Sequence, residues 1–203
     1  MRPGARARIG TADYVVLALG FAVFAAVFNS GGDLVYSMAI GSSFLAAITV
    51  AVYGVQVKGL FNLGPAALAL SPIYALALYA SFYAGYRASL VLGMGADVEK
   101  VYSMVYPSID RLALLALISL SEEVYWRGGV QELLVRRRMG KPWWLASIPY
   151  SLVHVSSGIP VLVPAALVAG LILGHAASRL GLAASTLAHY SWLLLMFRFL
   201  PVV

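Results

Sequence analysis

The chain has 203 residues, of which 62% are hydrophobic and only 11% are charged, and its mean hydropathy is +0.88. Such a composition excludes a soluble globular domain and predicts a polytopic membrane protein. The formal net charge is +6 and the chain contains no cysteine, so disulfides and a cysteine nucleophile are also excluded.

The basic residues flank apolar segments and do not form one extended patch. They gather in two clusters, at Arg2, Arg6, Arg8, Arg136, Arg137, Arg138 and Lys141. The cytoplasmic ends of membrane spans carry such an excess of Lys and Arg. We therefore expect both clusters on the cytoplasmic side of a membrane, and no nucleic-acid partner.

Long uncharged runs predict where the chain crosses the membrane. They cover residues 14–32, 34–57, 59–86, 142–178 and 180–197. One crossing needs about 20 residues. The fourth run is long enough for two crossings, because the Ser-Ser-Gly-Ile-Pro sequence at 156–160 breaks it. With a further apolar helix at 112–134, these runs predict about seven spans in an all-α transmembrane bundle of six to eight helices.

The helices are expected to form a single transmembrane domain over residues 1–203, with N-terminal spans over 1–96 and a motif-bearing core over 111–200. The first span is predicted to be retained, because no clear small-residue cleavage site follows it. Residues 97–111, which mix charged and apolar side chains and include Pro107, predict an interfacial amphipathic helix or loop. The expected location is an integral, multi-pass position in the cell membrane.

Two adjacent carboxylates stand in the middle of the apolar helix at 112–134. Residues 121–128 read Ser-Glu-Glu-Val-Tyr-Trp-Arg-Gly. An ionised side chain inside a membrane is costly unless it is paired, hydrated or functional. Arg127 lies four residues after Glu123 and shares its helical face, whereas Glu122 points about 100° away. We therefore expect Glu123 to pair with Arg127 and Glu122 to be the freer carboxylate.

Three histidines follow this helix. His154 lies just before the predicted break at 156–160, and His175 lies beside a cationic span end, where it is expected to cap the helix or face water. His189 lies in mid-span, where an ionisable side chain is a functional-site hypothesis by default. The spans that carry Glu122, His154 and His189 are therefore expected to converge.

These residues resemble the motifs of the glutamate-type intramembrane proteases related to the CAAX prenyl endopeptidase, also called the CPBP or ABI family. The first family motif, Glu-Glu-x-x-x-Arg, is matched by Glu122, Glu123 and Arg127. The second motif, an aromatic residue followed four positions later by His, is matched by Tyr150 and His154. The order and spacing of these motifs carry the resemblance.

The remaining family motifs are matched in part. A glycine-rich helix in the family resembles residues 170–174, and the last motif, His followed four positions later by Asn or Asp, is met at His189 but has Leu193 in the amide position. The resemblance covers about residues 112–200. It implies an all-helical membrane protease.

The resemblance also implies hydrolysis of a peptide bond by an activated water. Glu122 would take a proton from the water, and His154 would hold that water or share the proton. His189 would donate to the developing oxyanion, while Glu123 and Arg127 form a buried ion pair. The implied substrate is a peptide or a lipidated protein, with CAAX-type processing of a C-terminus as one such activity. The reaction would require a water-filled cavity that opens to the cytoplasmic side or laterally to lipid.

Leu193 removes one expected donor from the oxyanion site, and such a loss typically lowers the rate by about 10²–10³-fold. Candidate substitutes are Ser191, Ser185, Thr186 and His175, and Tyr150 is a further accessory candidate.

Three other interpretations compete with this one. In the first, Glu122, His154 and His189 hold zinc in a metal-dependent membrane protease. The sequence has no His-Glu-x-x-His pair, and Arg127 would repel a metal, so no cofactor is expected. In the second, the chain is a non-catalytic scaffold, immunity-type protein or chaperone of the same fold. A transporter is disfavoured, because the sequence shows no clear inverted repeat.

Overall fold

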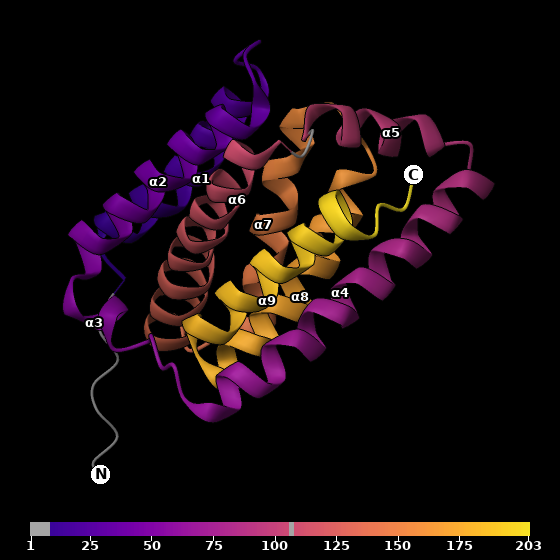
Figure 1. Ribbon diagram of the computed structural model, residues 1–203. Helices are drawn as coiled ribbons and strands as arrows, with labels where there is room; N and C mark the ends of the chain where they lie inside the picture. The colour runs from indigo at the N-terminus through magenta and orange to yellow at the C-terminus, as the bar shows by residue number, and fades with distance from the viewer. Residues whose placement is uncertain (1–8, 106–107) are drawn as a thin grey trace.

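The computed structural model describes residues 9–105 and 108–203, and within these ranges every regular element is helical, as predicted (Figure 1). Arg2, Arg6, Arg8 and Pro107 lie outside the described residues. The elements in chain order are α1 (Thr11–Phe28), α2 (Leu34–Tyr53), α3 (Val55–Lys58), α4 (Pro65–Val91), α5 (Gly95–Met104), α6 (Ile109–Glu122), η1 (Glu123–Arg138), η2 (Trp143–Ala146), α7 (Ser147–Leu152), η3 (Val153–Ser157), α8 (Leu162–Leu180), α9 (Leu182–Leu194) and η4 (Leu195–Phe199).

Four of the described helices, α1, α2, α4 and α8, are long and apolar enough to cross a membrane. The protein is therefore a multi-pass membrane protein. The other predicted crossings are helical but divided into shorter pieces: α6 and η1, then η2, α7 and η3, then α9 and η4. The first part of the segment predicted as an interfacial helix or loop is helical and forms α5, which carries Asp97, Glu99 and Lys100.

Capping and turn residues mark the starts and ends of several helices at positions that the sequence indicates. The side chain of Asp33 caps α2 by accepting a hydrogen bond from the backbone N–H of Val35, and Pro65 occupies the first turn of α4. Gly158 ends η3 with a positive φ of 64°, inside the break predicted at 156–160. These turns reverse the chain and set the helices antiparallel.

Contacts between elements define two opposite ends of the bundle. At one end, the Arg138 side chain donates to Asp13 at 2.5 Å and lies over the ring of Tyr53, which joins the end of η1 to the start of α1 and the end of α2. At the other end, Arg111 at the start of α6 pairs with Asp33 in the turn between α1 and α2. We call the first the basic end, because it carries Lys58, Arg136, Arg137, Arg138, Lys141 and Arg179.

The second end, which we call the α5 end, also holds the C-terminal part of the chain. The Tyr102 hydroxyl of α5 donates to the carbonyl of Met196 at 2.9 Å, and the backbone N–H of Val202 donates to the same hydroxyl at 3.1 Å. Figure 1 shows α5 and the C terminus at one end of the bundle and α3 at the other.

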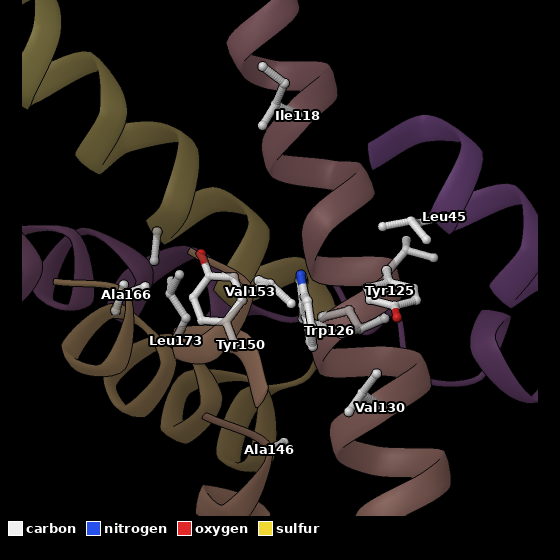
Figure 2. Packing of buried hydrophobic residues seen from close by; sticks show 14 of the residues in the cluster. Leu45, Ile118, Tyr125, Trp126, Val130, Ala146, Tyr150, Val153, Ala166 and Leu173 are labelled. Atoms are coloured by element: carbon white, nitrogen blue, oxygen red, sulfur yellow. The ribbon is translucent and has the colours of Figure 1, made fainter. Parts of the chain in front are cut away.

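The helix formed by α6 and η1 runs through the middle of the bundle. Tyr125 points toward Leu45 of α2, while Trp126 projects from the other side toward Tyr150 and Val153 (Figure 2). Both aromatic side chains are fully buried, and their rings pack edge to face at 4.7 Å. From residue 121 to residue 135 nearly every side chain of this helix is buried, which fixes the position of the two carboxylates there.

Close packing between α1 and η1 gives a first prediction. A Cβ placed on Gly20 would overlap the hydroxyl of Tyr125, which donates to the carbonyl of Val16 at 2.7 Å. We expect Gly20→Ala to lower the free energy of unfolding by about 1–3 kcal/mol, because overpacking displaces Tyr125. Thermal unfolding in detergent measures the change.

The matched control is Gly85→Ala in α4. A Cβ at Gly85 meets nothing within 4 Å, so the alanine removes only backbone freedom and is expected to be neutral or to stabilise by about 0.4–1 kcal/mol. Equal stability losses in both variants would show that Gly20 is not a close-packing position.

Candidate active site

The two carboxylates lie at the junction of α6 and η1, where the helix widens from α to π geometry. Glu122 is 7% exposed and Glu123 is fully buried. π-helical turns are uncommon and frequently occur at functional sites. At about 1.5 Å per residue, Glu122 lies about 20 Å from the start of α6, near the middle of the helix that α6 and η1 form together.

Glu123 is held from two elements. Its Oε2 lies 3.5 Å from the Nε of Arg127, so the predicted ion pair is present. Its Oε1 lies 3.1 Å from the Nδ1 of His189 on α9. Because the carboxylate accepts, we assign the proton to Nδ1 of His189, which leaves Nε2 as the nitrogen available for chemistry.

Arg127 is buried, and its charge is balanced mainly by Glu123. Its guanidinium lies over the ring of Tyr150, 4.5 Å from the centroid. Among the described residues none of its nitrogens has a hydrogen-bond partner. Among the described residues, the arginine therefore depends on one carboxylate and one aromatic face.

Glu122 faces a different neighbour. The hydroxyl of Tyr150, on α7, donates to its Oε2 at 3.1 Å. Tyr150 thus contacts both motif residues, with its hydroxyl on Glu122 and its ring under Arg127. This single hydrogen bond leaves the other oxygen of Glu122 free to bind a water or a substrate group.

His154 lies one helical turn beyond Tyr150. Its Nδ1 is 2.8 Å from the Tyr150 carbonyl oxygen, so Nδ1–H donates and Nε2 remains available. Its ring packs against Phe24 and Phe28 of α1, with centroids 5.4 and 5.7 Å apart. The ring is thereby fixed in position, as a residue that orients a water must be.

A single cavity of about 470 Å³ is lined by Glu122, Tyr150, His154 and His189. These side chains come from α6, α7, η3 and α9, so the predicted convergence of the motif-bearing helices is present. Leu193 also lines the cavity, which puts the residue in the family's amide position at the wall of the site. The rest of the lining is almost entirely apolar.

The cavity extends from Glu122 toward the α5 end. Its wall there includes Val98 and Tyr102 of α5 and Phe197 of η4, and it includes none of the charged residues of the basic end. The sequence led us to expect an opening toward the cytoplasmic side or laterally toward lipid. The wide part of the cavity lies in the half of the bundle away from the basic end.

Other candidate residues do not reach this space. The Nδ1 of His175 is 2.8 Å from the hydroxyl of Tyr74, and its ring packs on Trp143. His175 is half-buried, so these contacts leave open the expectation that it caps its helix or faces water. Ser191, Ser185 and Thr186 are likewise absent from the cavity lining, and the Ser185 hydroxyl donates to the carbonyl of Leu182.

A metal site has no geometric support. Among the described residues, no group of three or more His, Asp or Glu side chains is arranged to hold a metal ion. The nearest imidazole to the carboxylate pair is directed to Glu123, which also faces Arg127.

The contacts Tyr150–Glu122 and His189–Glu123 were not anticipated from the sequence. They join residues that are 28 and 66 positions apart. A mid-span histidine in a membrane helix needs a polar partner. The position of His189 therefore indicated that a buried acidic side chain would contact it. Nothing in the sequence indicated which of the two glutamates would do so.

Comparison with known proteins agrees with this geometry. Residues 105–195 match the family model described as type II CAAX prenyl endopeptidase Rce1-like. Among curated proteins and solved structures, no match was found. The matched segment contains α6, η1, α7, η3, α8 and most of the described α9–η4 helix, and therefore every residue of the candidate site. The chain thus carries, over residues 105–195, a domain of the Rce1-like family of type II CAAX prenyl endopeptidases.

Proposed function

We propose that the protein is an intramembrane endopeptidase of the cell membrane that hydrolyses a peptide bond with a water activated by Glu122. One observation carries the proposal: Glu122, His154 and His189, which come from three different parts of the chain, line the same cavity. A family match over the same residues supports it.

In the proposed reaction Glu122 removes a proton from a water bound in the cavity. The resulting hydroxide oxygen bonds to the carbonyl carbon of the substrate, and the carbonyl π electrons move to its oxygen. When the tetrahedral intermediate collapses, the C–N bond breaks and Glu122 returns the proton to the leaving amine. No group outside the protein and its substrate is needed to balance the protons.

Neighbouring side chains position and stabilise these species. Nε2 of His154 holds the attacking water, since Nδ1 is occupied by the Tyr150 carbonyl. With both ring nitrogens protonated, His189 donates from Nε2–H to the oxyanion while its Nδ1–H donates to Glu123, whose carboxylate balances the positive charge of this imidazolium. Arg127 keeps Glu123 ionised and in place.

The cavity wall supports an apolar substrate. The lining accepts apolar groups, which both a lipidated C-terminus of CAAX type and an apolar peptide segment possess. The experiment is to incubate the purified protein in detergent with a library of quenched peptides that includes prenylated C-termini. Cleavage that is lost in His154→Ala supports the proposal. If the folded protein cleaves none of the peptides, the chain is better explained as a non-catalytic protein of the same fold. The replacement of the family's amide donor by Leu193 favours that alternative.

Leu193 gives a second prediction. It lines the cavity one turn beyond His189, where an amide could donate to the oxyanion. We expect Leu193→Asn to raise kcat by about 10–10²-fold, because one preorganised donor contributes two to three orders of magnitude in well-formed sites. The measurement is kcat on a single peptide, compared with Leu194→Asn on the same helix, which should not increase it.

A further inference from the structure

Two cavities of different character lie on opposite sides of the Glu123–Arg127 ion pair. The site cavity holds Glu122 and Tyr150, and the second cavity, of about 390 Å³, is lined by Arg127, Gln131, Arg136 and Arg179 at the basic end. No residue lines both. Arg127 lines the second cavity and its partner Glu123 adjoins Glu122 in the chain, so the buried ion pair lies between Glu122 and the basic end.

The charges of the described residues orient the bundle in the membrane. The basic end carries Lys58, Arg136, Arg137, Arg138, Lys141 and Arg179 against two acids, Asp13 and Glu132. The α5 end carries Arg87, Lys100, Arg111 and Arg198 against Asp33, Asp97 and Glu99. In the sequence, three further arginines precede α1, whose first residue lies at the basic end. The positive-inside rule therefore makes the basic end cytoplasmic.

The site cavity lies in the other half of the bundle. Its wall is formed by the last turns of α4, the start of α8, α5 and η4, all of which Figure 1 places toward the α5 end. Pro164 and Val168 of α8 and Leu92 beyond α4 line it and are exposed, so the space also reaches the outer surface of the bundle there. Glu122 is thus reached from the half of the membrane opposite the cytoplasm.

The side chains that line the site cavity indicate which kind of substrate it binds. The only charged or imidazole side chains among its lining residues are Glu122, His154 and His189, at the deep end. Phe82 and Trp192, whose ring centroids are 4.5 Å apart, form part of the apolar remainder. A substrate segment with apolar side chains on both sides of the scissile bond fits such a wall, whereas a charged segment would lose its hydration.

We infer that the protein cleaves an apolar peptide segment presented from the extracytoplasmic half of the membrane. The inference rests on the proposed function for the cleavage itself, but the side of access can be measured without it. The segment enters beside α5, and the bond to be cleaved reaches Glu122 at the deep end of the cavity.

The absence of cysteine in the sequence allows a direct test of access. Val98→Cys places one thiol in the cavity wall on α5, and Met139→Cys places one at the end of η1 on the basic end. A membrane-impermeant maleimide added to intact spheroplasts should label Val98→Cys and leave Met139→Cys unlabelled. Inside-out vesicles should show the reverse. Labelling of Val98→Cys from the cytoplasmic face alone would overturn the inference.

Cleavage is then measured in the same vesicles. The probe is a quenched peptide with an apolar centre and charged, impermeant ends that the detergent-solubilised protein cleaves. Right-side-out vesicles should cleave it without detergent, inside-out vesicles should lose that activity, and replacing the apolar centre with lysines should abolish cleavage in both. Cleavage only by inside-out vesicles contradicts the inference and leaves the proposed function intact. No cleavage in detergent contradicts the proposed function, and the thiol labelling still decides the side.

Discussion

Replacing Glu122 with glutamine is expected to reduce peptide cleavage by about 10²–10⁴-fold, the contribution of a positioned general base. Glutamine has nearly the same shape and can accept the hydrogen bond from Tyr150, so the fold should be preserved. It cannot remove a proton from water. The measurement is kcat/KM on one peptide, with thermal unfolding of both proteins recorded in the same detergent.

The matched control is Glu132→Gln in the same helix. Glu132 pairs with Arg136 at 2.5 Å and Arg137 at 3.0 Å near the basic end, away from the site cavity. Its removal is expected to leave cleavage unchanged. If Glu122→Gln retains the activity of the parent protein, Glu122 is not the base and the mechanism must be abandoned.

The second large effect is expected at Arg127. Arg127→Met leaves Glu123 buried without its cation, and losing one partner of a buried ion pair typically costs about 3–5 kcal/mol. The variant should therefore unfold at a markedly lower temperature. Cleavage should fall as well, because Glu123 also holds His189.

A double variant separates charge from packing. Glu123→Gln combined with Arg127→Met removes both charges and should recover much of the lost stability, since no unpaired ion remains in the interior. It should not recover cleavage, because His189 then lacks the carboxylate that stabilises its positive charge. If the double variant is no more stable than Arg127→Met, the arginine acts through packing and not through its ion pair with Glu123.

Local features of the site were predictable from the sequence. The pairing of Glu123 with Arg127 follows from a spacing of four residues on one helix, and the structure confirms it at 3.5 Å. The break at 156–160 and the interfacial helix near residue 97 follow from turn residues and mixed charge, and Gly158 and α5 are found there. Each of these depends on neighbours within a few residues.

Features that depend on how helices pack were not predictable. The sequence places His189 in mid-span, but only the packing of α9 against η1 brings its Nδ1 to Glu123. The same holds for Tyr150, whose hydroxyl reaches Glu122 from α7. The π geometry of η1 has no simple signature in residues 123–138.

The polar motifs alone do not predict the direction in which the cavity opens. Motif residues identify the deep end of the site, while its entrance is set by apolar residues such as Phe197 and Val98 that no motif distinguishes. An apolar side chain in a membrane protein can contact lipid, another helix or a substrate, so its residue type does not identify its partner. Only the three-dimensional arrangement assigns them to the cavity wall.

In the proposed mechanism Glu122 and His154 act on one bound water, and His189 stabilises the oxyanion in the same cavity. The most direct measurement is an experimental structure with a phosphinate analogue of a cleaved peptide, whose tetrahedral phosphorus imitates the carbon attacked by water. We predict one phosphinate oxygen within hydrogen-bond distance of Glu122 and the other facing Nε2 of His189, with the peptide running toward α5. An inhibitor bound in the basic-end cavity beside Arg127 and Arg179, with the space around Glu122 empty, would contradict the account.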